Sequence, residues 1–94
     1  MKRLNIYVRY TSKKDCRDKF LNEVDKNDIL DKIRSEDGCI MYEYFVSMDK
    51  DNQILLVESW EDESYQIEHM KQEHMKKLKE IKDKYILETY IDKI

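Results

Sequence analysis

The order in which hydrophobic periodicity changes along the chain is the feature that most restricts its fold. Four segments alternate between apolar and polar or carry runs of branched and aromatic residues, which predicts strands, and two repeat every three to four residues, which predicts helices. In chain order these segments are residues 4–10, 12–35, 39–47, 53–60, 62–82 and 85–91. The predicted order is therefore strand, helix, strand, strand, helix, strand.

The first helical segment has apolar residues four positions apart, at Cys16, Phe20 and Val24. Thr11 or Ser12 offers a side-chain oxygen for the helix N-cap. We expect one helix over about 12–35, with a break near residues 25–27. Gly38 ends it, because glycine accepts the left-handed backbone conformation at helix ends.

The second helical segment carries a stripe of residues spaced three or four apart, which should face the core. The stripe consists of Ile67, Met70, His74, Leu78 and Ile81. His69 lies five residues before His74, about 140° away around a straight helix. The pair could therefore share a metal only if the helix breaks between them, near Gln72, and we expect no metal binding by this pair.

The element order predicts an α+β fold of the ferredoxin-like type. Right-handed crossovers in a βαββαβ chain place both helices on one face of a four-stranded antiparallel sheet. The chain has no proline and a single glycine, and no linker-like stretch interrupts it. We expect one domain spanning residues 1–94.

The segment 39–47 is apolar on both strand parities, so both of its faces should be covered. Met41 and Phe45 lie on one parity, whereas Tyr42 and Tyr44 lie on the other. The helices can cover only one face of the sheet, and an apolar face left in water would be a large patch for a monomer. We therefore expect two sheets to pack face to face in a homodimer.

Charge and composition argue against several classes of protein. The net charge of −3 gives no basic field for nucleic acid. The longest aliphatic run, residues 54–57, is too short to span a membrane, so we expect no membrane partner and a cytoplasmic location. The two cysteines form neither a disulfide framework nor a zinc site, and one glycine cannot build a phosphate-binding loop. No metal and no cofactor are expected.

Three residues are candidates for chemistry. His74 lies within an apolar stripe, where an imidazole either transfers protons or hydrogen-bonds to a carbonyl as an ordinary core residue. Trp60 could line a pocket or simply fill the core. Glu58 shares the parity of Leu56 and Trp60, and a carboxylate there is costly unless it is poised for a reaction or paired with Arg9 or a lysine.

Several short motifs, in order along the chain, resemble the antibiotic biosynthesis monooxygenase (ABM) family over about residues 3–92. Two histidines follow the last motif, nine and fourteen residues past the tryptophan. The carriers of the resemblance are Glu36-x-Gly38-Cys39, Tyr42-Glu43, Val57-Glu58-x-Trp60-x-Asp62, His69 and His74.

The resemblance implies a ferredoxin-like monomer, a dimeric α/β-barrel and a ligand cavity between the sheet and the helices. The family includes monooxygenases that oxidise quinols and anthrones without metal or flavin, haem-degrading members, an autoinducer isomerase and members with no known reaction. Haem degraders resemble one another in a cavity-facing asparagine on the first strand and a tryptophan on the second helix. Here Ile6 and Val8 share the expected cavity-facing parity, Asn5 lies on the other, and the second helix has no tryptophan.

For a cofactor-independent monooxygenase, the resemblance implies that a base removes a proton from a phenol or enol, which then reacts with dioxygen. His74 is the candidate base, Trp60 would stack on the substrate ring, and Glu58 would orient His74 or hold a second proton. The candidate substrate-binding residues are Tyr42, His69 and Met70.

Two further functions compete with a monooxygenase acting on a small aromatic or quinol-like substrate. An isomerase would use an acid–base pair and consume no dioxygen. A non-catalytic dimeric stress protein that binds a small ligand would use Trp60 and His74 only for packing.

Overall fold

The structure is a computed structural model that describes residues 2–93. Four strands and four helices follow one another in the order β1, α1, α2, β2, β3, α3, α4, β4. Their bounds are β1 Leu4–Ser12, α1 Arg17–Lys26, α2 Ile29–Arg34, β2 Cys39–Val46, β3 Gln53–Trp60, α3 Glu63–His69, α4 Glu73–Tyr85 and β4 Ile86–Lys93.

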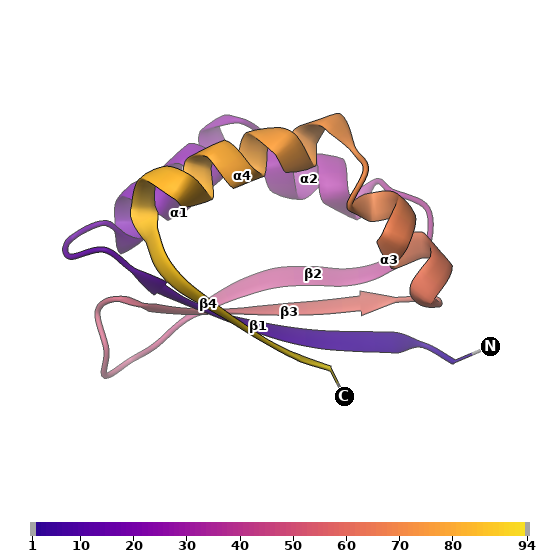
Figure 1. Ribbon diagram of the computed structural model, residues 1–94, viewed down its shortest axis with the longest axis horizontal. Helices are drawn as coiled ribbons and strands as arrows, with labels where there is room; N and C mark the ends of the chain where they lie inside the picture. The colour runs from indigo at the N-terminus through magenta and orange to yellow at the C-terminus, as the bar shows by residue number, and fades with distance from the viewer. Residues whose placement is uncertain (1, 94) are drawn as a thin grey trace.

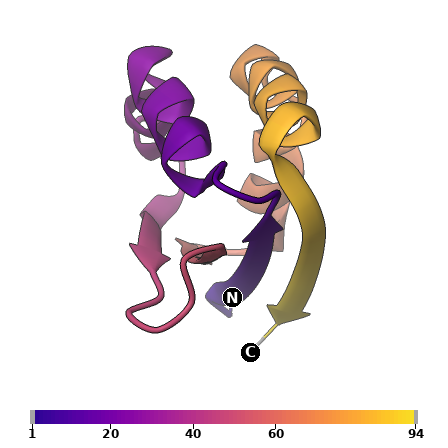
Figure 2. The ribbon, with the colours of Figure 1, turned by 90° about the vertical axis from the view of Figure 1, so that its left-hand side faces the viewer.

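The strands form one antiparallel sheet in the order β2-β3-β1-β4. All four helices lie over the same face of this sheet (Figure 1). Seen along the strands, α1 and α2 form one row of helices and α3 and α4 form a second row beside it (Figure 2). This arrangement confirms the predicted α+β, ferredoxin-like fold, with each predicted helix divided into two.

The first helical region differs from the prediction at its beginning. Strand β1 continues to Ser12, whose N–H donates to the carbonyl of Asn52 at 2.8 Å, so neither Thr11 nor Ser12 caps a helix. Helix α1 begins only at Arg17, after Cys16. The expected break is present at Asn27 and Asp28, where Asp28 adopts a left-handed conformation with a φ of 54°.

The second helical region is broken between His69 and Glu73. The amides of Lys71 and Gln72 bond to carbonyls three residues earlier, which tightens the chain into turns, and Gln72 is then extended. The prediction of one continuous stripe is therefore wrong at its first two members, because Ile67 and Met70 are 46% and 58% exposed. His69 is the buried residue of α3 instead.

The core lies between the helices and one face of the sheet. Alternate residues of β1 and β3 supply the sheet side, including Ile6, Val8, Ile54 and Leu56. Each such side chain contributes roughly 1.5–3 kcal/mol when it leaves water. The helices supply Phe20, Val24, Ile29, Ile33, Leu78 and Ile81.

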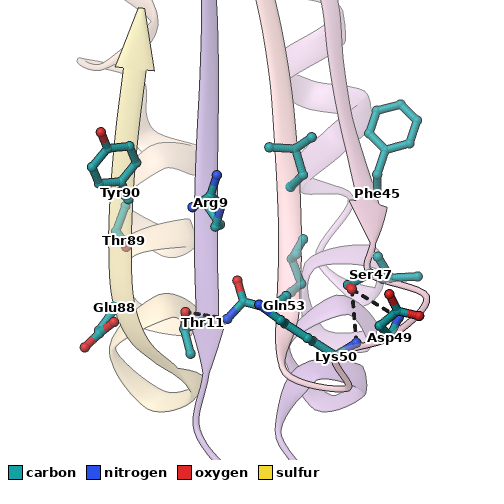
Figure 3. A pocket seen from close by; sticks show the side chains of 13 residues that line it. Arg9, Thr11, Phe45, Ser47, Asp49, Lys50, Gln53, Glu88, Thr89 and Tyr90 are labelled. Carbon is teal, nitrogen blue, oxygen red and sulfur yellow. Dashed lines mark hydrogen bonds between the residues drawn. The ribbon is translucent and has the colours of Figure 1, made fainter.

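The opposite face of the sheet carries no helix and exposes large side chains. Tyr7, Phe45 and Tyr90 are 41%, 44% and 62% exposed. A hollow of about 1030 Å³ crosses this face, with Phe45 at one side and Tyr90 at the other (Figure 3). The Arg9 guanidinium lies between them, 5.8 Å from the centre of the Tyr90 ring. We call this surface the open face.

Candidate functional site

The end of β3 places Glu58 and Trp60 under the helices. Both share the parity of the buried Leu56, and this parity faces the core. Trp60 is fully buried and Glu58 is 7% exposed. The Trp60 indole Nε1 donates a hydrogen bond to Glu58 Oε1 at 3.0 Å. The two residues therefore form a buried acid–indole pair.

The environment of Glu58 favours its protonated form. Burial raises the pKa of the Glu58 carboxyl above its ordinary value, and the hydrogen bond from Trp60 and the charges of His69 and Lys82 offset only part of this shift. Arg9 lies on the open face, so the predicted pairing of Glu58 with Arg9 is wrong. A lysine does act on Glu58, but from α4: the charge of Lys82 lowers the pKa of the Glu58 carboxyl. The Lys82 ammonium lies over the Tyr10 ring, with Nζ 4.9 Å from the ring centre.

His69, the last residue of α3, packs on the indole of Trp60. The two ring centroids are 4.6 Å apart, with 38° between the planes. On another side the Tyr42 ring lies 5.7 Å from the imidazole centroid. His69 is 1% exposed and Tyr42 is 2% exposed, so the imidazole sits in an aromatic slot closed to solvent.

Glu36 joins the two histidines. Its Oε2 lies 2.9 Å from His69 Nδ1 and 2.7 Å from His74 Nε2, and its Oε1 lies 3.1 Å from His69 Nδ1. An N–H on each imidazole nitrogen would donate to the same carboxylate. The side chains of Glu36 and His74 are 11% and 14% exposed, so this junction lies at the edge of the core.

The break between α3 and α4 makes this junction geometrically available. On a continuous helix His69 and His74 would point in different directions, whereas the turns at residues 70–72 bring both imidazoles to Glu36. The prediction that Glu58 orients His74 is wrong, because the hydrogen-bond partner of His74 is Glu36. Sequence reasoning missed Glu36 as a site residue, although it belongs to the Glu36-x-Gly38-Cys39 motif.

Gly38 allows the turn that carries Glu36 to lie close to α3. Gly38 has a φ of +77°, and a side chain there would collide with the ring of Tyr65 from α3. Its carbonyl accepts a hydrogen bond from the amide of Glu61 at 2.9 Å, just after β3. The turn that carries Glu36 is therefore fixed to the end of β3 by a backbone hydrogen bond and packs against α3 through the Tyr65 ring.

Of the two remaining candidate residues, Tyr42 lies in the site and Met70 does not. Tyr42 lies in the slot beside His69, and burial raises the pKa of its hydroxyl well above the ordinary value. The hydroxyl of the neighbouring Tyr44 is buried and finds no hydrogen-bond partner among residues 2–93. Met70 does not join the group, because its side chain is exposed in the turn after α3.

Two open hollows flank His74 on the outer surface. One, of about 490 Å³, includes Lys32, Tyr65 and Gln72 together with Glu36 and His74. The other, of about 430 Å³, lies between α2 and α4 and includes Ile29 and Glu80. His74 and Glu36 are thus the members of the group that a molecule in solution can reach, and His74 lines both hollows.

The arrangement is suited to proton transfer. A carboxylate beside an imidazole supports its action as a base, and the buried Glu58 can hold a second proton. Within the described part of the chain, no group of three or more His, Cys, Asp or Glu side chains is placed to hold a metal ion. Over the same residues, no helix is both long and apolar enough to traverse a lipid bilayer.

Comparison with known proteins places the chain in a family. The family model described as antibiotic biosynthesis monooxygenase matches residues 4–81. No curated protein matches the chain.

Solved structures share the fold over nearly the whole chain. Protein PA3566 from Pseudomonas aeruginosa has a TM-score of 0.88 and 17% identity, covering 100% of this chain and 93% of that one. A conserved protein from Methanosarcina mazei Go1 has a TM-score of 0.87 and 20% identity, with coverages of 100% and 92%. A structure described as an antibiotic biosynthesis monooxygenase has a TM-score of 0.83 and 20% identity, with coverages of 97% and 95%.

Proposed function

This chain belongs to the antibiotic biosynthesis monooxygenase family, and from that premise we propose that it is a cofactor-independent monooxygenase acting on a small aromatic or quinol-type substrate. The observation that carries the proposal is the junction of His69 and His74 on Glu36, beside the buried pair of Glu58 and Trp60. Family membership supports monooxygenase chemistry in general. The substrate class and the independence from a cofactor rest on the residues.

The proposed reaction begins with proton removal. A phenol or enol reacts slowly with dioxygen until it is deprotonated, so the enzyme must supply a base and an environment that stabilises the anion. His74 is the base, because it is reachable from both outer hollows and its Nε2 is already bonded to Glu36. Glu36 positions the ring and stabilises the imidazolium that forms.

The electrons for oxygen reduction come from the substrate itself. For an anthrone-type CH₂ group, one atom of O₂ becomes the new carbonyl oxygen and the other leaves as water with the two hydrogens. A quinol likewise gives a hydroxyquinone and one water. Trp60 and Tyr42 supply the aromatic surroundings of the substrate ring, and Glu58 holds the second proton.

The proposal includes a homodimer formed through the open face. Large aromatic side chains lie exposed on this face at three of its four strands, and soluble monomers rarely leave such a patch in water. They are Tyr7, Phe45 and Tyr90. A second copy of the same sheet is the occupant we propose, because the patch spans β1, β2 and β4 and a self-complementary sheet can cover all of it.

A non-catalytic ligand-binding protein is the second candidate. One observation favours it: Trp60, His69 and Tyr42 are all at most 2% exposed, and the imidazole already fills the slot beside the indole. In that case the group would act only as core packing and the outer hollows would be the binding surface. No contact of the site specifically favours an isomerase or a haem-degrading protein.

Oxygen uptake with a panel of quinols, anthrones and simple phenols tests the proposed function. We expect uptake of one O₂ per substrate with the protein freshly treated with a chelator, and one labelled oxygen atom in the product when ¹⁸O₂ is used. Substrate turnover without oxygen uptake would favour the isomerase. Binding without turnover across the whole panel would favour the non-catalytic protein.

A further inference from the structure

The imidazole of His69 occupies a place that suits an aromatic ring of a ligand. Its ring lies 4.6 Å from the Trp60 indole centroid and 5.7 Å from the Tyr42 ring centroid. Aromatic rings in proteins pack at such separations with offset or tilted planes. A planar ring of similar size in the same position would make the same contacts.

The segment that carries His69 is a short helix, attached to the rest of the molecule chiefly through the packing of His69 and Tyr65. Helix α3 has only seven residues and is bounded by the Asp62 cap and the turns at 70–72. Its outer side leaves Ile67 and Met70 in solvent. Among residues 2–93, the only side-chain hydrogen bonds between α3 and a more distant element are those from His69 to Glu36.

We propose that His69 is an internal stand-in for the ligand ring, and that release of His69 from Glu36 lets α3 move outward and opens a slot for one planar aromatic ring between Trp60 and Tyr42. This inference rests on the proposed function for the identity of the site, and it adds how a substrate enters. Glu36 acts as the latch, by which we mean the carboxylate whose hydrogen bonds to His69 keep the slot closed. Because His74 shares the same carboxylate, the base lies at the mouth of the slot that opens.

The closed state explains why entry must involve movement. Trp60 is fully buried, so no ring can stack on it while His69 is in place. The hollow of about 490 Å³ beside Glu36 and Tyr65 lies where α3 meets the latch. A ring bound there would be next to the opening, and outward movement of a seven-residue helix bounded by turns leaves most of the core folded.

Fluorescence of the single tryptophan, Trp60, tests the inference without turnover. The probes are imidazole, phenol and hydroquinone, added under nitrogen to the full chain, with cyclohexanol as a non-aromatic probe of similar size. The variants are His69→Ala, which empties the slot, and Glu36→Ala, which removes the latch. Met70→Ala truncates an exposed side chain on the same segment and is the matched control.

We expect the aromatic probes to change Trp60 fluorescence saturably in His69→Ala, and cyclohexanol to bind more weakly. Glu36→Ala should bind phenol at least about tenfold more tightly than the unaltered protein does, because a larger fraction of the variant is in the open state. Met70→Ala should match the unaltered protein. A folded His69→Ala variant that gives no saturable change, or that binds cyclohexanol as tightly as phenol, would overturn the proposal.

If His69→Ala does not fold, the phenol affinities of Glu36→Ala and the unaltered protein are compared instead. Equal affinities would then show that Glu36 does not keep the slot closed. The outcome is separable from the proposed function. Ring binding beside Trp60 with no oxygen uptake on any substrate would refute the proposed monooxygenase and support the slot. Oxygen uptake with no change in Trp60 fluorescence would support the monooxygenase and refute the slot.

Discussion

Nε2 of His74 lies 2.7 Å from Oε2 of Glu36, although 38 positions separate the two residues in the chain. The same oxygen lies 2.9 Å from Nδ1 of His69. One carboxylate on the turn before β2 therefore joins the end of α3 to the beginning of α4. The proposed base, its orientation and the closure of the aromatic slot all depend on that carboxylate.

Replacement of His74 by alanine should lower turnover of an active quinol or anthrone at least about 100-fold, because general-base catalysis contributes roughly that much. Steady-state oxygen uptake measures the change. Lys79→Ala, on the exposed side of the same helix and outside both hollows, is the control and should retain the rate. An unchanged rate in His74→Ala would remove His74 from the role of base.

Glu36→Ala should destabilise the fold, because it removes the partner of two imidazoles at the edge of the core. Hydrogen bonds to charged groups contribute about 1.5–3 kcal/mol each, so we expect a loss of roughly 2 kcal/mol or more in the free energy of unfolding. Urea denaturation measures it. Glu36→Gln, which keeps one acceptor oxygen, should lose less, and equal losses in the two variants would contradict the importance of the hydrogen bonds.

Glu58 should make stability depend on pH in a direction opposite to that of a salt-bridged carboxylate. Its pKa is raised by burial above the ordinary value of 4.5, so the folded state binds its proton more tightly than the unfolded chain does. The contribution is fully present below the unfolded pKa and is lost as the pH rises through the folded pKa.

Urea denaturation of Glu58→Gln between pH 4 and 7 checks this expectation. The variant keeps an oxygen that can accept from Trp60, and its stability relative to the unaltered protein should increase as the pH rises from about 4.5. Glu61→Gln, at an exposed position, is the control and should follow the unaltered protein. A constant difference across the range would refute the buried acid.

Gly38→Ala should cost stability for two separable reasons. The left-handed backbone costs a non-glycine residue about 1–2 kcal/mol, and the added methyl group would meet the Tyr65 ring. Tyr65→Ala combined with Gly38→Ala should relieve the collision and leave the backbone cost. Thermal denaturation of both single variants and the double variant measures the coupling, and strict additivity would argue against the contact.

The open face should account for self-association. Phe45→Glu and Tyr90→Glu each place a carboxylate within the exposed apolar patch, so we expect either variant to shift a dimer to a monomer in sedimentation velocity at micromolar concentration. Lys76→Glu introduces a carboxylate on the helical surface instead and should remain dimeric. A monomer for the unaltered protein would refute the dimer itself.

Much of the fold could be predicted from the sequence because strand and helix periods are local. The alternation in β1 and β3 identified which residues share a face, and the burial of Ile6, Leu56 and Trp60 agrees with it. The predicted start of the first helix is too early, because Thr11 and Ser12 can cap a helix or extend a strand equally well. Pairing with neighbouring chain segments decided that they extend β1.

The candidate site could be predicted only in part. Spacing singled out Glu58, Trp60 and the two histidines, but the direction of each side chain depends on where helices break. The break after His69 turned Met70 outward and His69 inward, which reversed their expected places. Glu36 lay outside the candidate residues because its role comes from a contact across 33 and 38 positions.

The amino-acid order by itself determined the succession of strands and helices, the apolar character of both sheet faces and the pairing of Glu58 with Trp60 on one parity. These follow from periods of two and about 3.6 residues, which are properties of neighbouring positions. Only the tertiary structure decided which face Trp60 addresses and that Glu36 binds both imidazoles. Such choices depend on crossover geometry and on contacts between distant segments, whose energies no local pattern records.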